Sequence, residues 1–252
     1  MMIWKQPVLT TPAENILYDE VLLSLADQGK GGEALRVWES PELFVVLGRT
    51  GKAGDDVKAA DARRDRVPVL RRFSGGGTVL QGPGCLNYSL IISKDRDPAL
   101  NDLRKSYAWI LGKVIAALGR SGVRAVFRPI SDLAVPDGEK KFSGNAQHRG
   151  RRFILHHGTI LYAFDLEKIE RYLAIPREVP EYRRKRGHLD FVVNVPLDPV
   201  VFRQALCEEF SVIGVDVEWP PEERQALAEA CAGRAVAVDL PDETRDPSPG
   251  RR

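Results

Sequence analysis

Two arginines followed closely by three glycines are the first residues in this 252-residue chain that could do chemistry. Residues 71–77 read Arg-Arg-Phe-Ser-Gly-Gly-Gly. Glycines have no Cβ, so their backbone N–H groups can approach phosphate or carboxylate oxygens closely. Arg71 and Arg72 add positive charge and two-pronged hydrogen bonding. The segment therefore indicates an anion-binding loop, with a flexible hairpin carrying two solvated arginines as the alternative.

Two familiar phosphate-binding loops do not fit this segment. A Walker loop needs Gly-Lys-Ser/Thr after its first glycine, and that triplet does not follow. Residues 82–84 (Gly-Pro-Gly) begin like a dinucleotide fingerprint, but Asn87 stands where its third glycine belongs. The chemistry of the glycine triplet is therefore not that of either class.

A pair of lysines opens the second candidate segment, residues 140–147 (Lys-Lys-Phe-Ser-Gly-Asn-Ala-Gln), after a predicted turn at 136–138. In an extended strand Lys140 and Lys141 point to opposite faces. One can remain in solvent while the other reaches a ligand and stabilises the charge that develops during acyl transfer. The alternative is two exposed lysines on a hairpin.

Two adjacent histidines, His156 and His157, form the third candidate. They also face opposite ways on a strand, so they do not make a metal site by themselves. The alternative is a core histidine whose ring nitrogens are satisfied by hydrogen bonds.

The elements that must position these residues alternate irregularly. Residues 11–29 predict a helix, because Thr11 can cap it, Pro12 suits its first turn and Glu14 completes a capping box. Strands clustered between flanking helices, without regular βαβ alternation, indicate an α+β fold with mixed or antiparallel sheets flanked by helices. Further helices are expected at 55–66, 97–119, 166–173, 200–210 and 222–231, and strands at 33–39, 42–48, 67–71, 85–93, 123–127, 132–135, 140–147 and 153–162.

Composition argues against several functional classes. The formal net charge is +2, which gives no indication of nucleic-acid binding. No apolar run is long enough to span a bilayer, and the N-terminus has no apolar core of a signal peptide. Cys85, Cys207 and Cys231 are far apart, which argues against a disulfide framework or a zinc knuckle. We expect a cytoplasmic protein with no nucleic-acid and no membrane partner.

Taken together, the segments resemble the motifs of lipoate–protein ligases A. Residues 71–79 are similar to the family's RR-x-SGGG-A/T-V loop, and residues 84–89 (Gly-Cys-Leu-Asn-Tyr-Ser) to its G-N-L-N-x-S strand. Residues 131–133 resemble its N-D-L step, residues 141–146 its K-x-S-G-x-A motif and residues 156–159 its H-H-G-T motif. Each motif is weak alone, but their order and spacing across residues 4–195 are specific.

The resemblance implies a fold shared with biotin ligases and octanoyltransferases, and a two-step reaction with ATP, Mg²⁺ and lipoate. A carboxylate attacks the α-phosphate of ATP, and an acceptor lysine then attacks the acyl-adenylate. Lys141 would be the catalytic group, with Lys140 in solvent. The substrate- and ATP-binding residues implied are Arg72, Gly75, Gly76, Gly77, Thr78, Val79, Leu80, Asn87, Asp132, Gly144, Asn145, Ala146, His157, Gly158 and Thr159.

The resemblance also implies partners and boundaries. The acceptor would be an acidic lipoyl-domain protein, steered by the basic cluster at residues 183–186. The acyl tail would lie in an apolar slot near residues 144–146 and His157. We expect a catalytic domain over residues 1–236 and a disordered tail over 237–252. The residues after 195 are too few for the accessory domain of many members, so a separate accessory protein is expected to support adenylation.

Two departures and two alternatives remain. Gln81 stands where the family usually has a histidine, and residues 48–52 lack the usual glutamine or asparagine after Arg49. A transferase of the same fold would take its acyl group from a carrier protein through a cysteine. A binding module would keep the fold without the reaction, although Lys141 and the glycine triplet argue against it.

Overall fold

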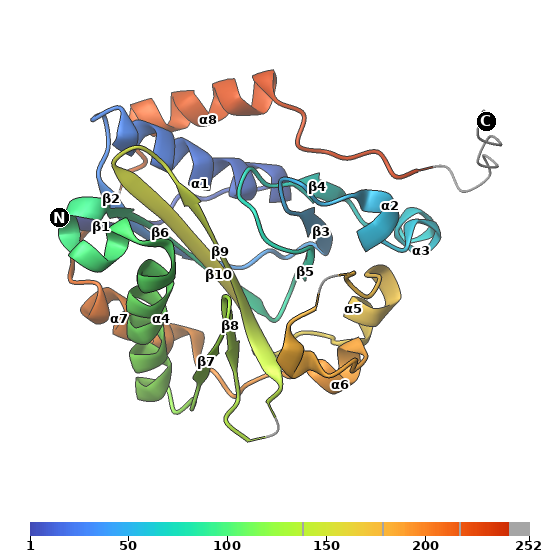
Figure 1. The fold of residues 1–252 in the computed structure, drawn as a ribbon. Helices are drawn as coiled ribbons and strands as arrows, with labels where there is room; N and C mark the ends of the chain where they lie inside the picture. Colours follow the sequence, from blue (N-terminus) through green and yellow to red (C-terminus); the bar gives the residue numbers. More distant parts are fainter. Residues whose placement is uncertain (138, 178, 217, 242–252) are drawn as a thin grey trace, which may run out of the picture.

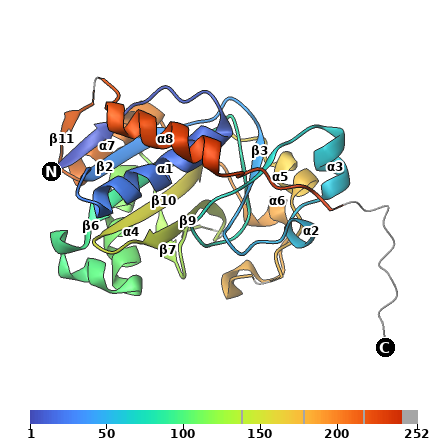
Figure 2. The ribbon, with the colours of Figure 1, turned by 90° about the horizontal axis from the view of Figure 1, so that it is seen from above.

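A large mixed sheet between two layers of helices forms the centre of the molecule (Figures 1 and 2). The computed structural model describes residues 1–137, 139–177, 179–216 and 218–241. Helices α1 (Pro12–Asp27) and α8 (Pro221–Gly233) cover one face, and α4 (Leu103–Arg120) and α7 (Pro199–Glu209) cover the other. The predicted α+β class with helices flanking the sheet is confirmed.

The large sheet has eight strands in the order β11-β1-β2-β6-β10-β9-β8-β7. β1 runs parallel to both β2 and β11, whereas the pairs from β2 to β7 are antiparallel. The three longest strands, β6, β10 and β9, lie side by side in the middle, where most motif residues fall. The strands are β1 (Met2–Lys5), β2 (Glu33–Trp38), β6 (Cys85–Ser93), β7 (Val126–Arg128), β8 (Asp132–Ala134), β9 (Lys141–Arg149), β10 (Phe153–Leu161) and β11 (Val212–Val215).

Helix α1 begins as its sequence predicts. The Thr11 side chain accepts from the Glu14 backbone N–H, and the Glu14 carboxylate accepts from the Thr11 backbone N–H at 2.9 Å. This capping box satisfies donors that the first helical turn leaves unpaired. Most of the helix is buried, and it packs against α8 and the strands β6 and β10.

Helix α4 begins later than the sequence predicted. Asp97 caps a short 3-10 helix, Pro98–Asn101, by accepting from the Ala99 N–H at 2.8 Å. Asp102 then caps α4 by accepting from the Lys105 N–H at 2.8 Å. Aspartate is favoured at N-cap positions. Asp97 and Asp102 therefore begin two separate helices where the apolar spacing suggested one.

The helix predicted at residues 55–66 is broken. The structure has α2 (Ala53–Asp56) and α3 (Ala59–Arg64) in its place. Between them Val57 forms a bridge with Leu173, and the Lys58 N–H donates to the Tyr172 carbonyl at 2.9 Å. Residues 172–173 end α5 (Glu167–Tyr172), so a contact distant in sequence interrupts the helix.

A small three-stranded sheet, β4-β3-β5, carries the glycine loop. Its strands are β3 (Phe44–Leu47), β4 (Val69–Arg71) and β5 (Val79–Gln81), and the loop connects β4 to β5. On the outer edge of β4 the Arg71 N–H donates to Val236 O and the Val238 N–H donates to Val69 O, both at 2.8 Å. The boundary expected after residue 236 therefore falls within this pairing. Residues 242–252, where disorder was expected, lie outside the described residues.

Three buried apolar clusters hold these layers together. The first joins α4 and α7 to one face of the large sheet, the second joins α1 to the other face, and the third lies around the small sheet, α3 and α5. Gly138 of the predicted turn at 136–138 lies outside the described residues. No helix in the described part of the chain is long and apolar enough to cross a membrane.

Candidate functional site

The glycine loop is held by the buried guanidinium of Arg72. Its Nη2 donates to the carbonyls of Gly75 and Gly77, each at 2.8 Å, and its Nε donates to Ser74 Oγ at 3.1 Å. Burial lowers the pKa of Arg72 to about 10, which leaves the guanidinium charged at neutral pH. Arg72 thus stabilises the conformation of the loop by hydrogen bonds to the loop's own carbonyl groups.

Gly76 and Gly77 of the loop differ in whether a side chain could be accommodated. Gly76 has φ +87°, and a Cβ there would lie 3.3 Å from Ala146 Cβ and 3.0 Å from Arg72 Nη2. At Gly77 a Cβ would meet no heavy atom within 4 Å. Position 76 therefore requires glycine for the fold, whereas position 77 faces open space beside the loop.

The residues after the loop enter the small sheet. Thr78 Oγ1 donates to Asp56 Oδ2 at 2.6 Å, and this bond joins the loop to α2. Val79 and Leu80 belong to β5, where Leu80 is buried and pairs with Val45 of β3. Gln81, which stands in place of the expected histidine, is buried, and its Oε1 has no hydrogen-bond partner among the residues described.

The two histidines face opposite sides of β10, as alternation predicts. His156 is fully buried among Tyr88, Tyr107 and Gln147, and burial lowers its pKa to about 3. His157 Nε2 lies 2.7 Å from Ser74 Oγ. Burial, followed by the charge of Arg72, holds the pKa of His157 well below its usual value. His156 is thus the satisfied core histidine and His157 faces the glycine loop.

Motif residues on β9 and β10 lie directly opposite one another. Gly144, Asn145 and Ala146 pair with Thr159, Gly158 and His157, respectively. The Asn145 side chain donates to Ser131 O at 2.8 Å and accepts from the Tyr88 hydroxyl. A Cβ at Gly158 would lie 1.9 Å from Asn145 Oδ1, so this glycine makes room for the Asn145 amide.

Lys141 lies at the start of β9 and forms an ion pair with Asp132 of β8, with Nζ 2.7 Å from Oδ1. The lysine side chain is 28% exposed and runs along the strand, because a Cβ at Gly144 would lie 3.1 Å from Nζ. The ammonium and the glycine loop, through Gly76 and Ala146, therefore border the same stretch of β9. This arrangement can bind an anion.

Tyr182 is a contact of this site that the sequence did not indicate. Its hydroxyl donates to Asp132 Oδ2 at 2.7 Å. Burial and the charge of Asp132 raise the pKa of Tyr182, so the hydroxyl keeps its proton. The residue lies on a short 3-10 helix, Glu181–Arg183, outside the motifs. No local pattern marks a bond between residues so far apart in sequence.

Asn87 and Cys85 are buried in β6. The Asn87 amide donates to the Cys85 carbonyl at 3.3 Å, so the structure gives it a partner within its own strand. Burial raises the pKa of the Cys85 thiol to about 12. Cys207 and Cys231 lie on α7 and α8 and are partly buried and exposed, respectively.

The basic cluster at residues 183–186 is less exposed than its charges suggested. Arg183 is buried, with its guanidinium 4.8 Å from the centre of the Phe191 ring. Arg186 donates to the carbonyls of Tyr182 and Glu139. Arg184 is 76% exposed and pairs with Glu139. Arg184 and Lys185 therefore present the charge at this surface.

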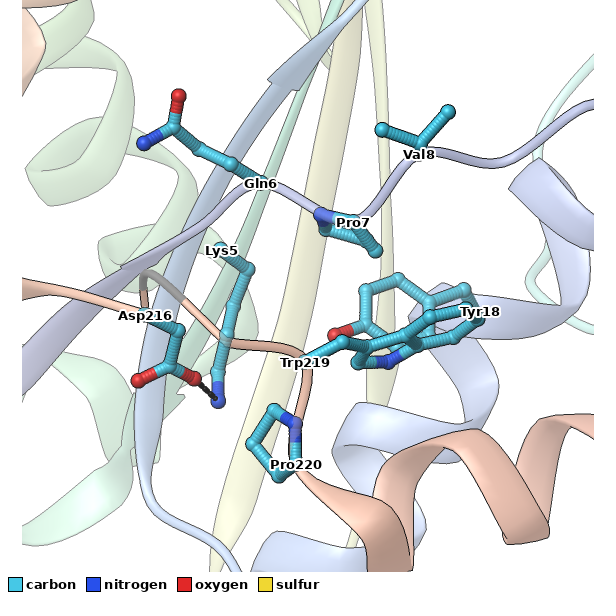
Figure 3. A pocket seen from close by; sticks show the side chains of 8 residues that line it. All are labelled: Lys5, Gln6, Pro7, Val8, Tyr18, Asp216, Trp219 and Pro220. Carbon is cyan, nitrogen blue, oxygen red and sulfur yellow. Dashed lines mark hydrogen bonds and ion pairs between the residues drawn. The ribbon is translucent and has the colours of Figure 1, made fainter.

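Two pockets lie outside the Lys141 region. One, of about 600 Å³, is lined by Phe73, His148 and Arg49 together with residues of α1, and Phe73 directly precedes Ser74 of the glycine loop. The other, of about 250 Å³, is lined by the end of β1 and the residues after it, by Tyr18 of α1, and by Asp216, Trp219 and Pro220 ahead of α8 (Figure 3). In it Lys5 pairs with Asp216, and Tyr18 stands against Trp219. No motif residue lines this second pocket.

The comparisons with known proteins identify the family. The model of the lipoyl protein ligase A/B catalytic domain matches residues 11–211. The chain therefore belongs to the lipoate–protein ligase A/B family. It is 33% identical over 178 residues to a probable lipoate-protein ligase A of Mycoplasma pneumoniae, covering 69% of this chain and 50% of that protein. It is also 34% identical over 180 residues to a putative lipoate-protein ligase A of Aeropyrum pernix, covering 71% and 63%. This chain thus spans between half and two thirds of the length of these relatives.

Another relative carries a different activity in its name. The octanoyltransferase LipM of Brevibacillus brevis is 26% identical over 260 residues, covering 91% of this chain and 94% of that protein. Family membership therefore leaves ligase and transferase chemistry both open.

Solved structures share the fold. A bi-partite lipoate protein ligase of Thermoplasma acidophilum, studied with its E2 lipoyl domain, has a TM-score of 0.74 at 22% identity, covering 91% of this chain and 90% of that one. A lipoate-protein ligase A bound with ATP has a TM-score of 0.71 at 22% identity, covering 91% and 92%. The biotin/lipoate ligase catalytic fold expected from the sequence is confirmed.

Proposed function

We propose that this protein activates lipoate, or a related medium-chain acyl acid, with ATP and transfers it to a lysine of a lipoyl-domain protein. The observation that carries the proposal is the position of Lys141. Its ammonium lies over Gly144 beside Asp132, and the glycine loop reaches the same stretch of β9 at Ala146. An ammonium and a glycine loop that border one stretch of strand suit an acyl phosphate.

In the first step an oxygen of the acyl carboxylate attacks the α-phosphorus of ATP. The bond from that phosphorus to the bridging oxygen breaks, and pyrophosphate leaves with the electron pair. Lys141 would stabilise the added negative charge on the phosphoryl and acyl oxygens. Arg72 would act through the loop, since its donors are bonded to Gly75 O, Gly77 O and Ser74 Oγ.

In the second step the neutral amine of the acceptor lysine attacks the acyl carbon. The carbon–oxygen bond to AMP breaks, an amide forms and the nitrogen loses a proton. Lys141 would again face the charge on the acyl oxygen and on departing AMP. A single positioned lysine can therefore serve both half-reactions.

The acyl tail would run from Lys141 along Gly144–Ala146 towards His157. Gly144 and Ala146 add little bulk to this strand, and His157 and Ser74 close it at the far end. Phe73, which precedes Ser74, lines the pocket of about 600 Å³.

Magnesium would accompany the triphosphate. Mg²⁺ in such sites takes one or two carboxylates and several phosphate and water oxygens. No group of three or more metal-type side chains occurs in the described residues, which fits an ion held largely by its substrate. Both carboxylate oxygens of Asp132, beside Lys141, are engaged by Lys141 and Tyr182, so the ion would be held through substrate oxygens and would neutralise phosphate charge.

The alternative, an acyltransferase, needs a reactive cysteine at the acyl site. Burial raises the pKa of Cys85 to about 12, so little of it is thiolate at neutral pH. Cys207 and Cys231 lie on helices that cover the large sheet. These observations favour the ligase.

The deciding experiment offers the purified protein either ATP with lipoate, octanoate or biotin, or an octanoyl carrier protein. The proposal expects pyrophosphate release with lipoate or octanoate and an acyl-lysine on an added lipoyl domain. Acyl transfer from the carrier protein without ATP would establish the transferase, and tight binding without either reaction would establish a binding module. An accessory protein, if used, would raise adenylate synthesis while transfer of preformed lipoyl-adenylate proceeds without it.

A further inference from the structure

The segment from Glu181 to Val193 contacts both Lys141 and its ionic partner, Asp132. The Tyr182 hydroxyl donates to Asp132 Oδ2 at 2.7 Å, while Lys141 Nζ occupies Oδ1 of the same carboxylate at 2.7 Å. The Val193 N–H donates to the Lys141 carbonyl at 3.0 Å. One end of the segment therefore fixes the lysine backbone, and the other fixes its ionic partner.

Packing around Phe191 and a hydrogen bond hold the segment itself. The Tyr182 and Phe191 rings lie 5.2 Å apart, and the Arg183 and Arg186 guanidinium groups lie 4.8 Å and 5.3 Å from the Phe191 ring centre. Arg183 Nε also donates to Arg186 O at 2.9 Å. The Tyr182 hydroxyl is thus placed by packing around Phe191, and its proton stays on because burial raises its pKa.

We propose that Tyr182 is a positioning residue for Lys141 and acts through Asp132. A carboxylate that accepts a hydrogen bond on Oδ2 cannot rotate freely, so Oδ1 keeps its direction towards Lys141. The same bond draws charge from the carboxylate, so Asp132 neutralises less of the ammonium field. Both effects keep Lys141 directed at the reacting oxygens, where a small displacement costs rate.

The inference rests on the proposed function, because its readout is acyl-adenylate chemistry. Tyr182→Phe removes the hydroxyl and keeps the ring against Phe191. We expect kcat for adenylate formation, and for transfer from preformed lipoyl-adenylate, to fall about tenfold to a hundredfold, the loss of a hydrogen bond to a charged group. KM for lipoate should change less than threefold, because Tyr182 lies behind Asp132 and does not line the acyl path.

A matched control is available at Tyr172, whose hydroxyl donates to Asp65 Oδ2 at 2.9 Å. Tyr172→Phe removes the same kind of bond from α5 and should leave kcat unchanged. A double-mutant cycle with Asp132→Ala then separates positioning from folding, because alanine keeps no group that could bond the Tyr182 hydroxyl. If Tyr182 acts through Asp132, Tyr182→Phe should have little further effect in the Asp132→Ala background, whereas a general loss of structure would add its full effect.

The outcomes distinguish the two proposals. Wild-type protein that neither forms adenylate nor transfers preformed lipoyl-adenylate contradicts the proposed function. If the wild type is active and Tyr182→Phe has the same kcat, the positioning role is overturned. An equal loss of kcat in Tyr172→Phe, or additive effects in the double-mutant cycle, also overturns it. A fall in kcat for Tyr182→Phe that vanishes when Asp132 is replaced supports it.

Discussion

Ser74 Oγ lies 2.7 Å from His157 Nε2, and this contact joins the glycine loop of the small sheet to β10 of the large sheet. Arg72 Nε donates to the same hydroxyl oxygen, so the hydroxyl proton is free to point at His157. Because the pKa of His157 is lowered, the ring is neutral, and its tautomer decides whether Nε2 accepts this proton or donates to Ser74 Oγ. The two sheets are thereby joined where His157 pairs with Ala146 of β9.

Replacement of Lys141 tests the assignment of the catalytic lysine. Lys141→Ala should lower adenylate formation about a hundredfold to a thousandfold, because it removes a charge directed at developing negative charge. Lys140→Ala is the matched control and should leave the rate nearly intact. Equal losses in the two variants, measured by pyrophosphate release, would show that the roles of the neighbours are reversed.

The glycine loop permits a test that separates binding from folding. Gly77→Val places a side chain in open space and should weaken ATP or adenylate binding at least about tenfold, with little change in melting temperature. Gly76→Val should also destabilise the fold by about 1–2 kcal/mol, because φ is +87° at Gly76. Calorimetric binding and thermal melts of both variants check this. A stable Gly77→Val variant with normal ATP binding would contradict the loop's role.

Cys85 should be dispensable. Cys85→Ser alters a buried, protonated thiol and should leave ligation within about twofold of wild type at pH 7.5, with a small loss of stability. Cys231→Ser, at an exposed position, serves as the control. A thioester on Cys85 detected by mass spectrometry would instead establish the transferase.

His156 should make the folded state sensitive to acid. Its pKa is lowered from 6.5 to about 3, so near pH 5 the unfolded chain binds a proton that the native state does not. The stability that His156 contributes is therefore complete above pH 6.5 and is lost as pH falls towards 3. Between pH 7.5 and 5 the loss should be about 2 kcal/mol. Urea unfolding at both pH values checks this: the free energy of unfolding should fall by this amount more in the wild type than in His156→Gln. An equal fall in the two proteins would contradict the prediction.

Charge reversal at Arg184 and Lys185 tests the acceptor surface. The double variant Arg184→Glu/Lys185→Glu should slow transfer to a lipoyl domain several-fold at low salt and flatten its salt dependence, while adenylate formation is spared. Arg224→Glu on α8, away from this surface, is the control. Arg183 is unsuitable because it is buried against Phe191. Unchanged salt dependence would remove the cluster from acceptor binding.

Local patterns in the sequence predicted much of this fold. The capping box of α1, the long antiparallel pair β9 and β10 and the opposite faces of His156 and His157 all follow from side-chain spacing. Strands β1, β5 and β11 are short and were missed, because their partners are distant in the chain. The break at Val57 has the same origin, since it depends on Leu173.

The candidate site divides in the same way. The structure places Lys141 beside Asp132 and Gly144, and the glycine loop reaches the same strand at Ala146. The sequence motifs did not show that Arg72 donates its hydrogen bonds to loop carbonyls, or that the Tyr182 hydroxyl donates to Asp132. Both contacts depend on the direction in which a long side chain points, and only the folded structure defines that direction.

The hydrogen bonds of Val236 and Val238 with β4 attach the last described residues to the strand from which the glycine loop begins. Arg71 lies on β4, and the loop that begins at Arg72 leaves directly from that strand. A protein shortened before Val236 would expose the outer edge of β4 to water and to other chains. Truncation at this end should therefore lower nucleotide affinity and promote aggregation, although no motif residue is removed.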